Sequence, residues 1–155
     1  IYGGTFRLAE KWLPRQGVTT SGFCAHDPLT IRDAVTENSR MLIFETPTNP
    51  NLRVSDIAAV CEEAHRHGLV VVFDNTFASP ALQNPLDLGA DIVVHSTTKY
   101  IAGHSDVIGG ATVTNSDELG TWLYEWNKAW GAVPSPFDGW LALRGVKTLA
   151  VRMRA

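Results

Sequence analysis

Two apolar runs of the chain end in residues that could do chemistry. The first, residues 70–75, carries the carboxylate of Asp74 near its end, and the second begins at Asp91 and is followed by three hydroxyls and an amine over residues 96–99. Such β-branched runs are typical of strands buried on both faces of a parallel sheet. Because ligands bind outside the carboxyl ends of such strands, we expect these groups to meet in one crevice. The set suits pyridoxal phosphate, which needs an acid for its ring nitrogen, donors for its phosphate and an amine for its aldehyde.

The elements that must position these groups alternate along the chain. Residues 41–44 predict a further buried strand, closed by a rigid turn over residues 45–50, and residues 110–114 predict another. Residues 18–24 are a short strand candidate. Strands that alternate with helices predict an α/β fold with a mostly parallel sheet flanked by helices.

The helix over residues 55–67 has the most complete signals. Ser55 can cap its beginning, its apolar residues fall on one face, and Gly68 stands where a C′ glycine belongs. Aromatic residues at near-helical spacing in another helix, residues 117–130, predict a buried or subunit-facing stripe. A helix over residues 5–13 is expected to stop at Pro14. A short helix over residues 27–35 is expected to begin with Asp27 as its cap and Pro28 at its first position. A last helix is expected to begin near Ser135, and the helical pattern of residues 149–154 is cut off by the end of the sequence.

Composition narrows the class of protein. With 155 residues, 45% of them hydrophobic and 19% charged, the chain can form one globular domain. Its net charge of −3 and the lack of a basic block argue against nucleic acid as a partner, and no apolar run approaches a membrane span. Cys24 and Cys61 are expected to be small buried residues in a reducing compartment, the cytoplasm, and no metal site is expected. The chain starts at Ile1 and ends within a helical pattern, so we expect a piece of a longer chain.

Six short segments resemble, in order, those of one family. The chain is similar to the pyridoxal-phosphate enzymes of cysteine and methionine metabolism: cystathionine γ-synthase, cystathionine γ-lyase, O-acylhomoserine sulfhydrylase and methionine γ-lyase. The resemblance implies an aspartate-aminotransferase-like (fold type I) large domain. Residues 1–155 would be its cofactor-binding part, truncated at both ends, without the N-terminal segment and the C-terminal small domain. The matching segments are Tyr2-Gly3-Gly4-Thr5, Glu45-Thr46-Pro47-Thr48-Asn49-Pro50, Phe73-Asp74-Asn75-Thr76, Ser96-Thr97-Thr98-Lys99-Tyr100, Gly103-His104-Ser105-Asp106-Val107 and Leu143-Arg144-Gly145-Val146-Lys147-Thr148-Leu149.

The resemblance gives the strand-end residues specific roles. Lys99 corresponds to the lysine that forms the Schiff base, and burial together with the electrophilic aldehyde would favour its neutral amine. Asp74 would pair with the pyridinium nitrogen and so make the ring a better electron acceptor. Ser96 and Thr98 would donate hydrogen bonds to the phosphate, because alternation in an extended segment puts them on one side and Thr97 on the other.

Two further residues are assigned by the resemblance alone. Tyr2 corresponds to the tyrosine that stacks on the cofactor ring with its hydroxyl near the reacting carbons. Asn49 corresponds to the asparagine that hydrogen-bonds the ring oxygen. For the motif around His104, structural hydrogen bonding is expected and a metal is not.

The implied activity is γ-replacement or γ-elimination on homoserine-derived or sulfur amino acids, of the cystathionine γ-synthase or γ-lyase type. Residues 79–86 look most like γ-synthases, and Gly4 stands where methionine γ-lyases typically carry cysteine. O-acylhomoserine sulfhydrylase and methionine γ-lyase stay as alternatives. Two hypotheses from other functional classes also stay open: an aldolase-like enzyme whose lysine forms a Schiff base with the substrate, and a non-catalytic fold fragment. The parent protein would be a homo-oligomer, a dimer of dimers, acting on small amino acids, and the isolated chain is expected to be inactive.

Overall fold

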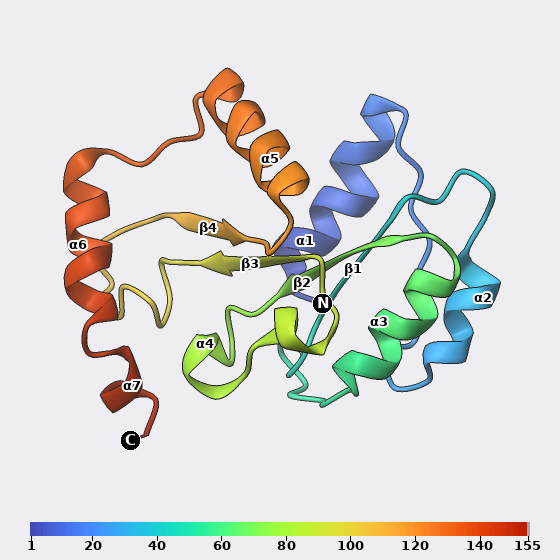
Figure 1. Ribbon diagram of the computed structural model, residues 1–155, viewed down its shortest axis with the longest axis horizontal. Helices are drawn as coiled ribbons and strands as arrows, with labels where there is room; N and C mark the ends of the chain where they lie inside the picture. Colours follow the sequence, from blue (N-terminus) through green and yellow to red (C-terminus); the bar gives the residue numbers. More distant parts are fainter. Residues whose placement is uncertain (155) are drawn as a thin grey trace.

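Four strands form one sheet in the order β1-β2-β3-β4 in the computed structural model, which describes residues 1–154 (Figure 1). β1 (Met41–Glu45), β2 (Val70–Asp74) and β3 (Ile92–Ser96) are parallel, and β4 (Gly110–Val113) is antiparallel to β3. The mostly parallel sheet predicted from the sequence is therefore confirmed. The register pairs Glu45 with Asp74, so the first two strands end level with each other.

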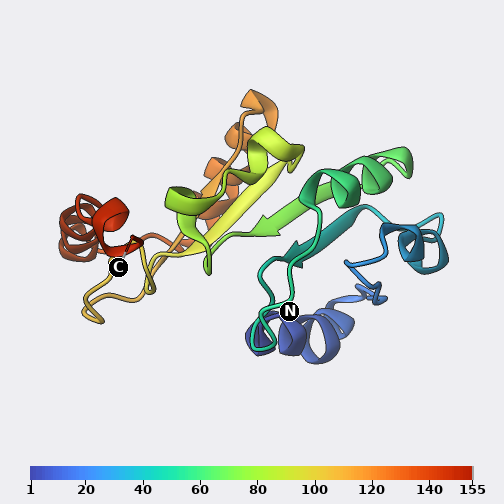
Figure 2. The same cartoon turned by 90° about the horizontal axis from the view of Figure 1, so that it is seen from below.

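Helices lie toward both ends of the molecule. α2 (Ile31–Ala34) and α3 (Ile57–Arg66) lie at one end, where α3 packs against β2. α6 (Pro136–Val146) and α7 (Leu149–Arg152) lie at the opposite end, toward which β3 points, in both views (Figures 1 and 2). The other elements are α1 (Gly3–Arg7), η1 (Leu8–Trp12), η2 (Leu13–Gln16), η3 (Pro28–Thr30), α4 (Ser79–Leu82), η4 (Pro85–Leu88) and α5 (Asp117–Trp130).

The main core lies between α3 and the parallel strands. The apolar face of α3, predicted from its spacing, buries Val60 and Cys61 in the same cluster as Val71 of β2. Phe73 is 0% exposed and meets Phe44 edge to face, with ring centroids 4.8 Å apart. This core fixes β1 and β2, and so fixes where their carboxyl ends stand.

The boundaries of α3 differ slightly from the prediction. Asp56, not Ser55, is the N-cap: its Oδ1 accepts a hydrogen bond from the amide of Ala59 at 3.1 Å. The Ser55 amide instead donates to the hydroxyl of Thr46. Gly68 follows the helix with φ 69°, a left-handed conformation that suits glycine, as predicted.

Two predictions near the beginning of the chain are wrong. Residues 18–24 form no strand, because side chains replace a ladder there: the hydroxyl of Ser21 donates to the carbonyl of Ala34, and the Cys24 amide donates to the hydroxyl of Thr30. The first helix also does not stop at Pro14. It continues as the tighter η2, where a proline near the start leaves no hydrogen bond unmade.

The two cysteines have different environments. Cys24 is exposed, which contradicts the expectation that it is buried, because its segment is not part of the sheet. Cys61 is buried as predicted. Desolvation, with a smaller effect of the Asp91 carboxylate, raises the pKa of its thiol to about 11, so this thiol packs as an apolar group.

A charged cluster joins α2 to α3. Glu63 is only 2% exposed. Its carboxylate accepts hydrogen bonds from Arg32 Nε at 2.7 Å and from Arg66 Nη1 at 2.9 Å, and His67 Nε2 lies 3.3 Å away. The hydrogen bond from Arg32 is the largest cause that lowers the pKa of Glu63 to about 2. The Glu63 carboxylate and the Arg32 guanidinium therefore both stay ionised inside the fold.

The aromatic stripe of α5 lies on the surface of the chain. Trp122, Trp126 and Trp130 are between 46% and 76% exposed, so the stripe is not buried in this chain. Neighbouring rings contact one another along it: Trp122 and Trp126 are tilted with centroids 5.7 Å apart, and Trp126 and Trp130 are stacked with centroids 6.0 Å apart. None of the helices described within residues 1–154 is long and apolar enough to cross a membrane.

Candidate cofactor site

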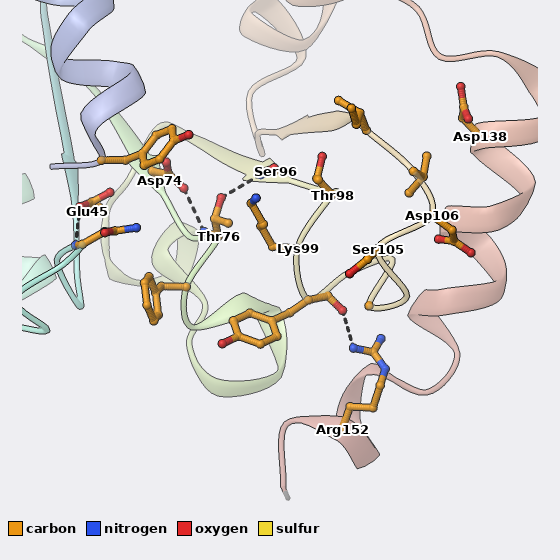
Figure 3. A pocket seen from close by; sticks show the side chains of 17 residues that line it. Glu45, Asp74, Thr76, Ser96, Thr98, Lys99, Ser105, Asp106, Asp138 and Arg152 are labelled. Carbon is orange, nitrogen blue, oxygen red and sulfur yellow. Dashed lines mark hydrogen bonds between the residues drawn. The ribbon is translucent and has the colours of Figure 1, made fainter.

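One cavity of about 1410 Å³ opens at the carboxyl ends of the parallel strands (Figure 3). This is the edge at which open α/β sheets bind ligands. Turns that follow β1, β2 and β3, the start of the chain and the long connection from β3 to β4 all contribute to its wall. All six residues predicted for the site lie on it: Tyr2, Asn49, Asp74, Ser96, Thr98 and Lys99.

Lys99 lies in the turn that begins where β3 ends. Its amide donates to the carbonyl of Ser96 at 3.2 Å, and its carbonyl accepts from the amide of Gly103 at 2.8 Å. The turn therefore fixes the backbone on both sides of this residue. The side chain itself is exposed to the open cavity, so the expectation that Lys99 is buried is not met by this chain.

Asp74 is the last residue of β2, and one of its oxygens is already engaged. Oδ1 accepts a hydrogen bond from the amide of Thr76 at 2.9 Å. The hydroxyl of Thr76 in turn accepts from the amide of Ser96 at 2.8 Å (Figure 3). Thr76 therefore holds the ends of β2 and β3 together and orients the carboxylate, a role that the sequence analysis missed.

The two predicted phosphate donors differ in their hydrogen bonds. Within residues 1–154 the hydroxyl of Ser96 has no hydrogen-bond partner, whereas the Thr98 hydroxyl accepts from the amide of Gly109 at 2.9 Å and donates to its carbonyl at 3.3 Å. The longer bond is weak for a hydroxyl donor. Residues 97–100 form a turn, yet Ser96 and Thr98 both line the cavity and Thr97 does not.

Tyr2 and Asn49 are brought in by two other segments. The ring of Tyr2 lies so close to Gly4 that a β-carbon at that glycine would overlap its Cε1. The amide of Asn49 donates to Glu45 Oε1 at 2.8 Å, which ties the turn to the last residue of β1. Glu45 is a second positioning residue that the sequence analysis did not single out.

The histidine motif has the structural role expected for it. His104 Nδ1 lies 2.6 Å from the carbonyl of Ala102, within the connection that lines the cavity. No group of three or more His, Cys, Asp or Glu side chains that could hold a metal ion occurs among residues 1–154.

Besides Glu45, three charged residues on the wall were not predicted for the site: Asp106, Asp138 and Arg152. Arg152 of α7 and Asp106 of the connection between β3 and β4 both line the cavity (Figure 3). Asp106 Oδ2 accepts from Arg144 Nη2 of α6 at 2.6 Å. Asp106 and Arg144 both lie in segments that resemble the family, but nothing in their local spacing indicates that they form a pair.

The donors on the wall fit pyridoxal phosphate by their chemistry. An amine for the aldehyde, a carboxylate for the ring nitrogen, a hydroxyl without a partner for the phosphate and an aromatic ring face one space. Each of these is a group that this cofactor uses in proteins.

Comparison with known proteins points the same way. The family model described as Cys/Met metabolism PLP-dependent enzyme, in which PLP is pyridoxal phosphate, matches residues 1–155. The chain is 52% identical over 154 residues to a probable cystathionine gamma-synthase of Herpetosiphon aurantiacus, covering 99% of this chain and 48% of that protein. It is 50% identical over 155 residues to a cystathionine gamma-lyase of Dictyostelium discoideum, covering 100% of this chain and 40% of that protein.

A solved structure agrees with the fold. The crystal structure of cystathionine gamma-lyase from Lactobacillus plantarum, complexed with L-serine, superposes with a TM-score of 0.94 at 46% identity, over 97% of this chain and 40% of that one. The chain thus spans less than half the length of these relatives.

Proposed function

The chain belongs to the family of Cys/Met metabolism PLP-dependent enzymes, and we propose that the whole protein catalyses γ-replacement or γ-elimination as a cystathionine γ-synthase or γ-lyase. The observation that carries the proposal is that Lys99, Asp74 and Ser96 line one cavity at the carboxyl edge of the sheet. Relatives of similar identity carry both names, so both reactions are tested.

Four residues of the wall have specific tasks in this proposal. Lys99 holds the cofactor through its amine, Asp74 binds the ring nitrogen, and Ser96 and Thr98 bind the phosphate, the latter by turning its hydroxyl away from the weak bond to Gly109. When bound, pyridoxal phosphate accepts electrons from the carbon that loses a proton. The Lys99 amine, once released, takes the proton from the substrate α-carbon and moves protons at the β-carbon.

Tyr2 and Asn49 complete the proposed site. The Tyr2 ring covers the cofactor ring from the start of α1. The Tyr2 ring can take this position because glycine at position 4 has no β-carbon to overlap it. Asn49 bonds the ring oxygen from a turn that Glu45 holds. We further propose that residues 1–155 are the cofactor-binding part of the large domain, and that the whole protein is a cytoplasmic homo-oligomer, a dimer of dimers.

The test is made on the whole protein. We expect visible absorbance from bound pyridoxal phosphate in the wild type, and after borohydride a cofactor adduct on the peptide that contains Lys99. Lys99→Ala should lose both. Lys128→Ala is the matched control, because Lys128 is an exposed lysine of α5, outside the cavity. An adduct on any other lysine would refute the proposal.

The reaction is assigned by two assays on the same preparation. O-succinylhomoserine with cysteine reports γ-replacement, and cystathionine alone reports γ-elimination. We expect turnover of at least about 1 per second in one of them, the lower end of ordinary enzyme rates. Cofactor bound at Lys99 without turnover in either assay would contradict the proposed activity.

A further inference from the structure

The connection between β3 and β4 carries Lys99 but has little regular structure of its own. Residues 97–109 run through turns and bends along the wall of the cavity. A connection of this kind keeps one conformation only where other parts of the fold hold it. Its fixed points therefore decide where the Lys99 amine stands.

Arg152 of α7 supplies two of these fixed points, in addition to the hydrogen bonds within the turn itself. Its Nη1 donates to the carbonyl of Tyr100 at 2.6 Å (Figure 3), and its Nη2 donates to the carbonyl of Ile101 at 3.3 Å. On its other side Nη2 donates to the carbonyl of Gly145 at 2.8 Å and Nε to the hydroxyl of Thr148 at 3.0 Å. One guanidinium thus joins the two residues that follow Lys99 to the end of α6.

Two glycines allow this close approach. A β-carbon on Gly145 would overlap the backbone carbonyl of Ala102, so α6 meets the connection backbone to backbone. A β-carbon on Gly103 would overlap the guanidinium of Arg152, and Gly103 has a φ of 72°. Ala102 is also buried with Leu141 of α6 in a small apolar cluster. The contact is therefore a packed one and not a lone surface hydrogen bond.

The far end of the connection has a second tie. Arg144 donates to Asp106 at 2.6 Å, but both side chains are about a third or more exposed. Exposed ion pairs contribute little to stability. The bonds from Arg152 to backbone carbonyls beside Lys99 are the ones that bear on the position of the amine.

We propose that Arg152 is a positioning residue for Lys99: it fixes the backbone directly after the lysine so that the amine stands at one place in the cavity. The catalytic role of the Lys99 amine at that position rests on the function proposed above. Arg152 hydrogen-bonds the carbonyls of Tyr100 and Ile101 and not the Lys99 amine. A guanidinium suits the task, because its planar fork carries five donors and can bond several carbonyls at once, whereas a lysine offers one point charge.

The first test uses hydrogen–deuterium exchange on the whole protein freed of cofactor. Arg152→Met removes the donors but keeps an unbranched apolar stem. We expect exchange over residues 97–103 to rise about tenfold or more, as a local opening would, while exchange in β2 stays unchanged. Arg154→Met is the matched control, because Arg154 is exposed and close in sequence. Unchanged exchange over residues 97–103, or an equal rise in β2, would overturn the proposal.

The second test uses the protein loaded with pyridoxal phosphate. Misplacement of a reacting group by about 1 Å can cost on the order of 100-fold in rate, so Arg152→Met should lose about 10- to 100-fold in kcat while KM changes by less than about threefold. The pH at which the visible absorbance of the bound cofactor changes should also shift, since the Lys99 amine has moved. A kcat equal to that of the wild type would overturn the proposal.

A conservative variant covers the case in which Arg152→Met does not fold. Arg152→Lys keeps the charge and one donor group, so it should fold and lose less kcat and less protection than the methionine variant is expected to lose. Full wild-type protection and kcat in Arg152→Lys would show that charge alone suffices and would refute the role of the fork. Because the exchange test needs no cofactor, its result stands apart from the outcome of the Lys99→Ala experiment.

Discussion

At the scale of single residues, the carboxylate of Asp74 is fixed by one oxygen and open at the other. Oδ1 accepts from the amide of Thr76, and among the residues described Oδ2 has no hydrogen-bond partner. A strand-end aspartate that caps a turn and one that binds a ring nitrogen are therefore compatible in the same side chain. The two tasks fall to different oxygens.

Asp74→Asn separates these tasks. The asparagine keeps an oxygen for the Thr76 amide, so we expect the melting midpoint and the cofactor content of the whole protein to stay near those of the wild type. Turnover should fall on the order of 100-fold, because a ring without its anionic partner stabilises negative charge less well. Asp87→Asn, at an exposed aspartate outside the cavity, is the control. Near-normal turnover in Asp74→Asn would reduce Asp74 to a turn residue.

At the scale of elements, the beginning of α3 depends on Asp56. Its side chain accepts from the amide of Ala59, one of the four amides that a helix leaves unpaired at its first turn. Asp56→Ala should lower the free energy of unfolding by about 1 kcal/mol, and Asp56→Asn should restore most of it because asparagine is an equally good cap. Chemical denaturation of the three forms measures this, and an asparagine variant as unstable as the alanine variant would contradict it.

The spacing of apolar residues was enough to predict this helix, and continuous apolar runs were enough to predict the parallel strands; tertiary contacts decided the rest. Ser55 and Asp56 can both cap a helix; the fold chooses Asp56 because the Ser55 amide and hydroxyl are engaged with Thr46 and His26. Residues 18–24 were a strand candidate, but they pair with neither edge strand of the sheet, and side-chain bonds hold them instead.

The residues of the site also fall into two groups: those that the sequence predicts and those that only tertiary contacts bring to the site. Asp74 and Lys99 could be predicted because they stand at the ends of apolar runs, where the position in a sheet follows from the sequence. Thr76 could have been found as the second residue after such an end. Arg152 could not, because it reaches the connection from a helix that stands far along the chain, and no local pattern encodes that contact.

At the scale of the whole molecule, the Glu63 cluster makes stability depend on acid. The pKa of Glu63 is lowered from 4.5 to about 2, chiefly by the hydrogen bond from Arg32. A carboxyl whose pKa is lower in the folded state stabilises the fold fully above its unfolded pKa, and this contribution is lost as pH falls toward the folded value. The tie between α2 and α3 should therefore weaken between about pH 4.5 and pH 2.

Glu63→Gln tests this dependence. At pH 7 the variant should melt below the wild type, because Arg32 and Arg66 lose their buried anion. The difference in melting midpoint should shrink as the pH is lowered through 4 to 3. Glu62→Gln, which changes an exposed carboxylate on the same helix, is the control and should show a small difference throughout. A Glu63→Gln deficit that is constant from pH 7 to 3 would refute the assignment.

The placement of the tryptophans has an optical consequence. All five tryptophans of the chain lie at its surface, three of them in the stripe on α5, and the buried aromatic residues around β1 and β2 are phenylalanines. Indole emission shifts to the red when water gains access to the ring, and here the rings already meet water. Unfolding this chain should therefore leave its emission maximum nearly unchanged while far-ultraviolet circular dichroism is lost. Conversely, a blue shift of the emission under native conditions would signal that another surface has covered tryptophans of this chain, three of the five being those of the stripe on α5.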